Sequence, residues 1–173
     1  MKSGWFAFVT ACGLLALGSQ AAQAQGGATR PHDHQADVRK SGDQVMGFSH
    51  DKATHHFRLY SDGGAIEVNA NDRGDTATRD MIRMHLNHIA KMFAAGDFNA
   101  PMLIHDQVPP GVPALRRLRA AVKYRFEETP QGARVRIVTS HTEALRAVHE
   151  FLRFQITDHQ TGDALEVTQA PKT

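Results

Sequence analysis

Residues 55–70 have the sequence HHFRLYSDGGAIEVNA, in which apolar and polar side chains alternate on either side of Ser61-Asp62-Gly63-Gly64. Alternation with a period of two is typical of a strand that buries one face, and a short Asp-Gly turn joins antiparallel strands. The segments 55–60 and 65–70 are therefore predicted to form a β-hairpin.

The same pattern returns in the second half of the chain. The segments 122–127 and 133–139 alternate around Thr129-Pro130-Gln131-Gly132, which predicts a second hairpin. Each hairpin is followed by a short polar link and then by apolar residues at helical spacing. These patterns predict two helices, one over residues 78–95 and one over residues 143–157.

Polar and small residues mark the ends of both helices. Asp75 or Thr76 can cap the first helix, because a short side chain with an oxygen there accepts a hydrogen bond from a free backbone N–H. Gly96 is expected to end that helix. Ser140 or Thr142 can cap the second helix in the same way.

The order of these elements predicts the fold class. Residues 97–113 contain four prolines and are expected to be irregular, and a short helix is expected over residues 114–120. The chain then runs hairpin, helix, loop, hairpin, helix. We expect an α+β fold in which the two hairpins form a four-stranded antiparallel sheet and the two main helices pack on one face (ββα-ββα).

The two faces of the predicted sheet differ in chemistry. One face collects the apolar residues Phe57, Leu59, Ile66, Val68, Val122, Tyr124, Phe126, Val135 and Ile137. The other collects His56, Arg58, Tyr60, Glu67, Lys123, Arg125, Glu127, Arg134 and Arg136. Most charged faces are simply solvated, but this basic sheet face could instead bind an anionic partner or form a homodimer.

The first 24 residues have the features of a secretory signal peptide. Lys2 supplies the basic start, residues 5–17 form a short apolar run, and Ala22-Gln23-Ala24 fits a cleavage site. A Sec-type signal of this kind predicts a bacterial protein that is periplasmic or secreted. A lipoprotein signal ending at Cys12 is the alternative, although the apolar run continues for five residues beyond that cysteine.

The rest of the chain is expected to form one domain. Residues 25–50 are predicted to be a flexible N-terminal segment, residues 51–165 a single α+β domain, and residues 166–173 a tail. The whole chain has 173 residues and a formal charge of +2, which does not suggest a nucleic-acid partner. No apolar run is long enough for a transmembrane segment. Removal of the signal would take away the single cysteine, and with it disulfides and thiolate chemistry.

Histidine and methionine are the residues of this sequence whose side chains could bind a metal ion. The helix over residues 78–95 carries Met81, His85, His88 and Met92 at spacings of four, three and four, which places them along one stripe. Two imidazoles between two thioethers could hold a metal ion. The alternative is an ordinary core edge, where methionine fills gaps and histidine caps a carbonyl group.

Other segments could bring further ligands to this stripe. His105 and Met102 follow the helix, and His55 is expected on the sheet face that the helices cover. His149 lies on the second helix near apolar residues. The candidate metal ligands are His85, His88, His105, Met81, Met92, Met102 and His55. Among them, His85 and His88 are expected to be the primary ligands.

Without thiolates, this set of residues suits a copper ion best, because thioether sulfur favours Cu(I) and imidazole accepts either oxidation state. The hypothesis is a periplasmic protein that binds, buffers or delivers copper. Haem held by His or His/Met, or another small ligand, is the alternative use of the same residues. A metal-dependent enzyme is a third possibility, but the sequence has no hydrolase, phosphate-loop or dinucleotide motif.

Several separate stretches between His55 and Asp163 resemble a family of small secreted bacterial proteins. They are HHFRL at 55–59, GGAIEV at 63–68, HLNHIA at 85–90, PMLIH at 101–105, PPG at 109–111 and FLRFQITDHQTGD at 151–163. The resemblance implies no settled function. The recurring His and Met positions of that family coincide with the candidate ligands above.

Some members of that family are labelled aspartate carbamoyltransferase, and this label does not suit the present chain. The true transferase is about twice as long and binds phosphate through a Ser-Thr-Arg-Thr segment that this sequence lacks. It is also cytoplasmic, whereas the first 24 residues of this chain predict export. No carbamoyltransferase activity is expected.

Overall fold

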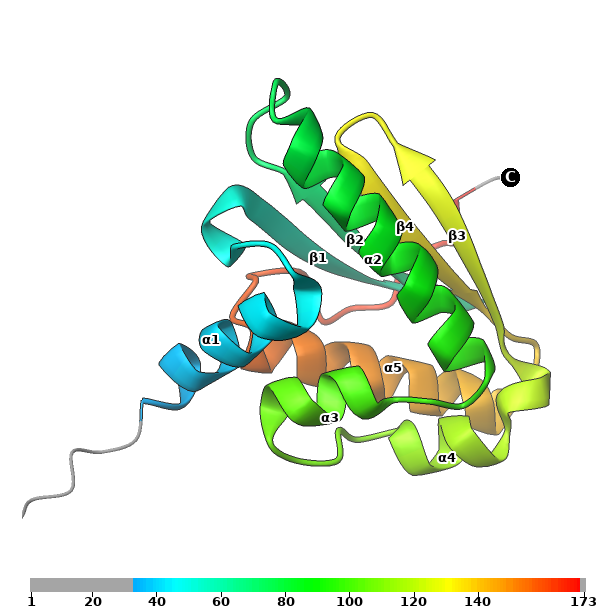
Figure 1. Ribbon diagram of the computed structural model, residues 1–173. Helices are drawn as coiled ribbons and strands as arrows, with labels where there is room; N and C mark the ends of the chain where they lie inside the picture. The colour runs from blue at the N-terminus through cyan, green and yellow to red at the C-terminus, as the bar shows by residue number, and fades with distance from the viewer. Residues whose placement is uncertain (1–32, 172–173) are drawn as a thin grey trace, which may run out of the picture. The chain divides into compact units, whose positions relative to one another are not determined.

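The computed structural model describes residues 33–171 (Figure 1). The predicted signal peptide, residues 1–24, lies outside the described residues, as do the first eight residues of the predicted N-terminal segment. Within the described part of the chain, no helix is long and apolar enough to cross a membrane.

Four antiparallel strands form one sheet in the order β1-β2-β4-β3. They are β1 Ala53–Tyr60, β2 Gly63–Ala70, β3 Lys123–Thr129 and β4 Gly132–Val138. Both predicted hairpins are present, and the α+β class with a four-stranded antiparallel sheet is confirmed. The register aligns Phe57 with Ile66, Ile66 with Val135, and Val135 with Phe126, so one apolar row crosses all four strands.

The turn of the first hairpin is tighter than predicted. Gly63 and Gly64 belong to β2, where they pair with Tyr60 and Leu59, so only Ser61 and Asp62 form the loop. Gly63 has a φ of 145°, and a Cβ atom there would lie 2.1 Å from a backbone oxygen of β4. Glycine is therefore required at this position, because no other residue fits between two strands this close together.

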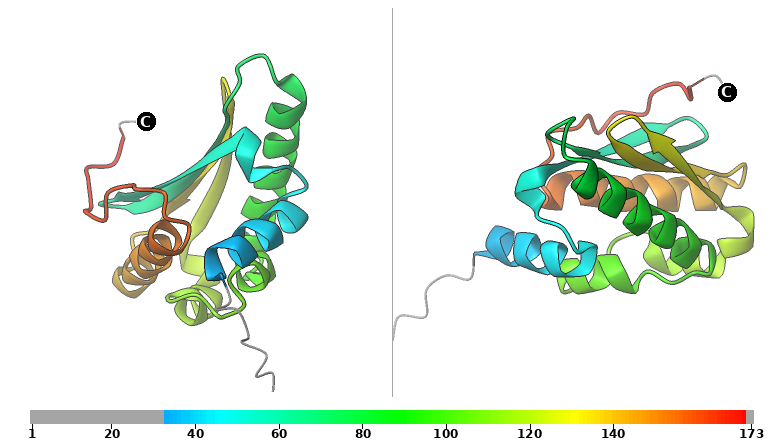
Figure 2. Two further views of the ribbon diagram at one scale, coloured as in Figure 1. Left: turned by 90° about the vertical axis from the view of Figure 1, so that its left-hand side faces the viewer. Right: turned by 45° about the horizontal axis from the view of Figure 1, so that its top comes forward.

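The two main helices are α2 Thr76–Ala94 and α5 Thr142–Asp158. Figure 2 shows both on the same side of the sheet, where α2 covers β3 and β4 and α5 covers β1 and β2. Asp75 caps α2 as predicted and accepts a 3.0 Å hydrogen bond from the Thr78 backbone N–H. The cap of α5 is His141, whose Nδ1 accepts from Ala144 N, and neither Ser140 nor Thr142 serves this purpose.

Two segments that were predicted to be irregular or flexible contain helices. Residues 34–46 form α1 His34–Met46, which buries Val38 and packs against α3. The helix α3 Asn99–His105 lies in the proline-rich stretch, where Pro101 falls in the first helical turn and costs no intrahelical hydrogen bond. The predicted short helix is α4 Val112–Arg117, followed by the single turn η2 Arg119–Ala121.

The inner face of the sheet is apolar as predicted, but the outer face is not uniformly solvated. Arg136 is only 8% exposed. Its guanidinium donates to the carbonyl oxygens of Gly64 and Ile137 and to Asp62. Asp62 in the hairpin loop and carbonyl oxygens of β2 and β4 therefore surround this arginine, so at this position the basic sheet face is occupied by contacts within the chain.

The C-terminal segment continues the sheet beyond the predicted domain end at residue 165. Asp163 accepts a hydrogen bond from Phe57 N, and Thr168 exchanges backbone hydrogen bonds with Leu59 and Ser61. These bonds cover the free edge of β1. Part of the predicted tail is therefore attached to the sheet along the strand that carries His55.

Candidate functional site

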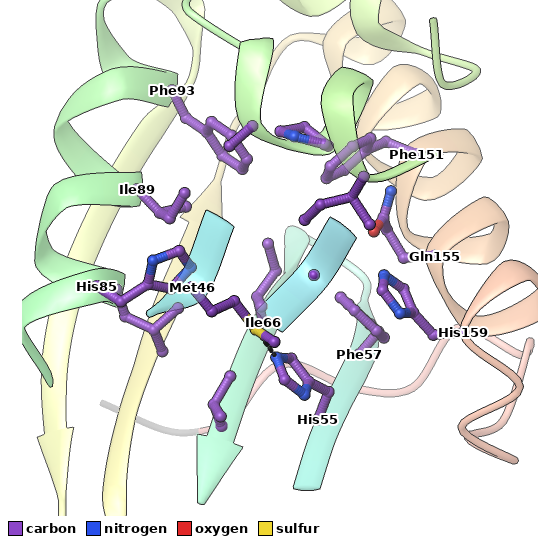
Figure 3. A pocket seen from close by; sticks show the side chains of 16 residues that line it. Met46, His55, Phe57, Ile66, His85, Ile89, Phe93, Phe151, Gln155 and His159 are labelled. Atoms are coloured by element: carbon purple, nitrogen blue, oxygen red, sulfur yellow. Dashed lines mark hydrogen bonds between the residues drawn. The ribbon is translucent and has the colours of Figure 1, made fainter. Parts of the chain in front are cut away.

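A cavity of about 70 Å³ lies on the inner face of the sheet, between α2 and α5 (Figure 3). The end of α1 and the helix α3 contribute to its wall through Met46 and Pro101. Most lining side chains are apolar, but three histidines from three elements also line it: His55, His85 and His159. A largely apolar lining with a few polar groups is the composition typical of ligand sites, and a volume of about 70 Å³ limits an occupant to a few atoms.

Met46 and His55 form the closest pair of potential metal ligands in this cavity. The Met46 sulfur lies 3.1 Å from Nε2 of His55, and Figure 3 shows this contact as a dashed line. His55 is the third residue of β1 and points to the same face as Phe57 because side chains alternate along a strand. Met46 is the last residue of α1, just before Gly47 ends the helix with a φ of 79°.

His85 and His159 approach the same space from opposite sides. His85 lies on α2 and packs its ring against the edge of Phe48. His159 is the C-terminal cap of α5, and its ring is parallel to that of His55 at a centroid distance of 6.1 Å. In Figure 3 the two helices flank the cavity, with His55 and Met46 between them.

Burial keeps these three imidazoles neutral at pH 7. Burial first, and then the positive charge that His85 would carry, lower the pKa of His55 to about 4. Burial, followed by repulsion from His88, lowers the pKa of His85 to about 4. The pKa of His159 falls to about 3, first through burial and then through His105 and His55. A neutral imidazole has a lone pair on one ring nitrogen, which a metal ion requires.

His105 lies beside the cavity in a hydrogen-bonded network. It is 2% exposed, with Nδ1 2.5 Å from Asp158 Oδ2 and Nε2 3.1 Å from Gln155 Oε1. Asp158 also accepts from His34 at 2.9 Å. Burial opposes ionisation of Asp158, but hydrogen bonds from His34 and His105 outweigh this effect and lower the pKa of the carboxyl group. Both ring nitrogens of His105 are therefore engaged by protein atoms.

The structure brings together only part of the predicted ligand set. His55 and His85 line one cavity, but His88 is exposed on α2. Met81 and Met92 pack against the hydrophobic core. Met102 lies on α3, where its sulfur accepts from Arg116 at 3.2 Å. Among the residues that the structure describes, no three His, Cys, Asp or Glu side chains are placed to hold one ion.

His149, the remaining histidine of the predicted cluster, lies in the middle of α5. Its Nε2 is 2.9 Å from the Tyr60 carbonyl oxygen and 3.1 Å from that of Gly63. A neutral ring can satisfy both contacts by donating one proton. His149 therefore fixes the first hairpin to α5 and does not belong to the cavity.

Two residues of the cavity were not identified from the sequence. Met46 lies in a segment without clear periodicity, so its place in the core has no sequence signal. His159 does have one, because Phe151, Gln155 and His159 follow one another at intervals of four along α5. A search for that spacing would have placed His159 on the same stripe as two core residues.

A polar groove of about 350 Å³ shares two of these histidines with the cavity. His55 and His159 line both the groove and the cavity, and His50 and Arg39 line the groove alone. Asp43 accepts a hydrogen bond from His50 Nδ1, 3.0 Å away. The ring pair of His55 and His159 therefore belongs both to a polar groove and to a largely apolar cavity.

Comparisons of the chain with known protein families, with curated proteins and with solved structures find no match. Inference about function therefore rests on the chemistry of the cavity. That chemistry consists of one thioether, three neutral imidazoles and an amide in largely apolar surroundings.

Proposed function

We propose that the protein binds copper in this cavity, with Met46 and His55 as the first two ligands. The observation that supports this most directly is the 3.1 Å contact between the thioether sulfur and the imidazole Nε2. Soft thioether sulfur combined with imidazole favours Cu(I) over zinc, magnesium or calcium. The two ligands come from different elements, α1 and β1, so the fold itself brings them together.

His85 is the third ligand in this proposal. Its ring lines the same cavity, and Cu(I) accepts the low coordination number that two imidazoles and one thioether provide. The low pKa values of His55 and His85 favour the site, because protons do not compete with the metal at neutral pH. The apolar wall, which includes Phe57 and Ile89, limits access of water to the ion.

Copper binding, buffering or delivery fits these features better than the alternative of haem. A cavity of about 70 Å³ is several times too small for a porphyrin. The polar groove lined by His50 offers a route for an ion toward the His55–His159 ring pair. In the periplasm or outside the cell, where the predicted signal would direct the chain, a copper carrier without thiols resists oxidation.

The test is a competition for Cu(I) between the purified full chain and a coloured chelator under anaerobic conditions. We expect one tightly bound Cu(I) per chain. Because each ligand contributes a direct bond to the ion, Met46→Leu and His55→Asn should each weaken the affinity by about 100-fold or more. Leucine retains the apolar volume of methionine, so the first variant removes little besides the sulfur atom.

Matched controls separate this site from the helix stripe predicted from the sequence. Met84→Leu changes a methionine that is 71% exposed, and His88→Gln changes the exposed histidine of α2. Both should leave the affinity within about threefold of the original. A large loss of Cu(I) affinity in His88→Gln with no loss in Met46→Leu would show that copper binds at the α2 stripe and not in the cavity. A wild-type chain that binds no Cu(I) would refute the proposed function.

A further inference from the structure

The two edges of the sheet differ in how the chain covers them. The strand β1 forms one edge, where Asp163 accepts from Phe57 N and the C-terminal segment bonds to Leu59. The strand β3 forms the other edge, and among the described strands it pairs only with β4 (Figure 1). An uncovered edge presents N–H and C=O groups to which another strand can bind. A further strand could therefore join the sheet at β3.

The turn of the second hairpin shows which backbone groups of β3 face outward. Thr129 pairs with Gly132 across two turn residues, and the pair that flanks a turn of this length is hydrogen bonded. Hydrogen-bonded pairs alternate along an antiparallel ladder, so the backbone groups of Tyr124, Phe126 and Glu128 point away from β4. In the part of the chain that the structure describes, these groups have no backbone hydrogen-bond partner.

The strand β3 has a regular shape that suits pairing. Over its seven residues it contains no proline, and its register with β4 is continuous, without a bulge. Phe126, at the centre of the strand, packs against the core but is only half-buried. The helix α2 contacts β2, β4 and β3, so it is centred over β4 and not over the edge. Neither the strand itself nor α2 prevents another strand from continuing the sheet.

The charges on β3 indicate which partner fits. Arg125 lies directly opposite Arg136 of β4, which is a like-charge pair, and Arg136 is neutralised by Asp62. Arg125 itself is exposed and forms no ion pair within the described residues. Glu127, two positions along on the same face, accepts from Arg134 at 2.6 Å through Oε2, so its Oε1 is left for another donor. The strand therefore offers a cation and a carboxylate oxygen side by side.

We propose that two copies of this chain form a dimer by antiparallel pairing of their β3 strands about Phe126. A twofold axis at this residue places Arg125 of each copy opposite Glu127 of the other, so the same ion pair forms twice. The outward backbone groups pair as well, Phe126 with its counterpart and Tyr124 with Glu128 of the other copy. The two sheets become one continuous sheet, and the inference does not depend on the copper site.

Charge favours this register over its neighbours. A shift of two residues in one direction places Arg125 opposite Arg125 of the other copy, and a shift in the other direction places Glu127 opposite Glu127. Like charges directly opposite each other destabilise a strand pair. In the register about Phe126, all seven residues of β3 are paired, and the two half-buried phenyl rings lie opposite each other on the inner face.

Reversal of charge at two positions tests both the edge and the register. Sedimentation velocity of the purified full chain should show dimers whose fraction rises with concentration. Arg125→Glu opposes two carboxylates and Glu127→Arg opposes two cations, so each variant alone should dimerise at least about tenfold more weakly. In an equal mixture, the two variants should form a heterodimer within about threefold of the original affinity, because every opposed pair then has opposite charges.

The matched control is Lys40→Glu, which makes the same change of charge at an exposed residue of α1 and should dimerise like the original chain. A wild-type chain that remains monomeric up to about 1 mM would overturn the proposal and leave the edge to a strand of another protein. A dimer that neither charge variant weakens, or folded variants that stay monomeric when mixed, would also overturn it.

A measurement on the unaltered chain covers the case in which a charge variant does not fold. Amide hydrogen exchange is followed by NMR above and below the concentration at which the dimer dissociates. The amides of Tyr124, Phe126 and Glu128 should exchange more slowly in the dimer, whereas those of Arg125 and Glu127, which bond to β4, should be protected at both concentrations. Equal exchange of the three outward amides at both concentrations would contradict the pairing.

Discussion

Two clusters of rings lie in the layer between the helices and the sheet, and they differ in chemistry. The aromatic cluster consists of Phe93, Phe98 and Phe151, with ring centroids 4.4 to 5.9 Å apart and exposures of 2% or less. The histidine cluster contains His55, His105 and His159, with neighbouring centroids 4.8 and 6.1 Å apart. Spacing is similar in the two clusters, but only the histidine cluster carries titratable groups.

The comparison indicates why histidines occupy the second cluster. A buried phenyl ring contributes apolar area without a polar penalty, whereas a buried imidazole loses hydration and must remain neutral. The lowered pKa values of His55 and His159 measure that penalty. Phenylalanine would serve packing better at both positions, so we infer that ligand chemistry and not stability accounts for the histidines.

The largest expected effect is the loss of a ring from the aromatic cluster. Phe98→Ala removes a fully buried side chain that contacts Phe93 and Phe151. The free energy of unfolding should fall by about 3–5 kcal/mol because the removal leaves a cavity in the core. Urea denaturation followed by circular dichroism measures this change. A loss below about 1 kcal/mol would show that this cluster is not the main source of stability.

The second effect concerns the network that holds the histidine cluster. Asp158→Ala removes the acceptor of His105 Nδ1 and leaves a buried N–H group unpaired. The free energy of unfolding should fall by about 1–3 kcal/mol at pH 7. Glu150→Ala, an exposed change on the same helix, should cost less than about 0.5 kcal/mol in the same denaturation experiment. Equal losses in the two variants would mean that the His105 network does not stabilise the fold.

A third effect separates the two clusters by pH. His159 has a pKa of about 3 in the folded chain and 6.5 as its ordinary value, so the unfolded chain takes up the proton first as the pH falls below 6.5. The contribution of His159 should therefore decrease between pH 6.5 and about pH 3, and Asp158 and Asp163 add a further loss as the pH falls below their ordinary pKa of 3.8.

Replacement of His159 by phenylalanine tests this pH dependence. At pH 7, His159→Phe should be neutral or slightly stabilising, because the new ring packs on Phe57 without a desolvation penalty. At pH 4.5 the variant should exceed the original chain in free energy of unfolding by about 2–3 kcal/mol more than at pH 7, because the unfolded histidine is protonated over this range and the folded one is not. Parallel pH profiles for the two chains would contradict the neutral, buried state of His159.

The smallest expected effect is the response of copper affinity to pH. Because His55 and His85 both have pKa values of about 4, Cu(I) affinity should change by less than about twofold between pH 7.5 and pH 5.5. Chelator competition at several pH values measures this. Two exposed histidines with ordinary pKa values would lose about 100-fold over the same range, so a steep decrease would point to surface ligands.

Local sequence patterns predicted most of the fold. The structure contains the hairpin predicted from alternation in residues 55–70, the cap at Asp75 and the helix end at Gly96. Each of these features depends only on residues close together in the sequence. The helices α1 and α3 were not predicted. Their apolar positions are few, and both helices form against each other and the core, so tertiary packing outweighs weak local preference.

The candidate site could be predicted only in part. His55 was placed on the correct face by strand parity, and His85 on the edge of the core by helical spacing. Helical spacing also predicted that His88 shares a site with His85. In the structure His88, three residues further along α2, is exposed to solvent, whereas His85 lines the cavity. His159 lies far from these residues in sequence, and no local pattern relates Met46 to His55 although only nine positions separate them.

The sequence by itself determined the two hairpins, the two main helices and the apolar inner face. Strand alternation, helical spacing and helix caps each depend on only a few neighbouring residues. Only the tertiary structure decided which polar side chains share the cavity. Packing of α1 and the end of α5 around β1 brings Met46, His55 and His159 together, whereas hydrogen bonds to Asp158 and Gln155 hold His105 beside them. Which side chains meet in the cavity depends on how far apart the helices and strands lie, and neither strand alternation nor helical spacing contains that information.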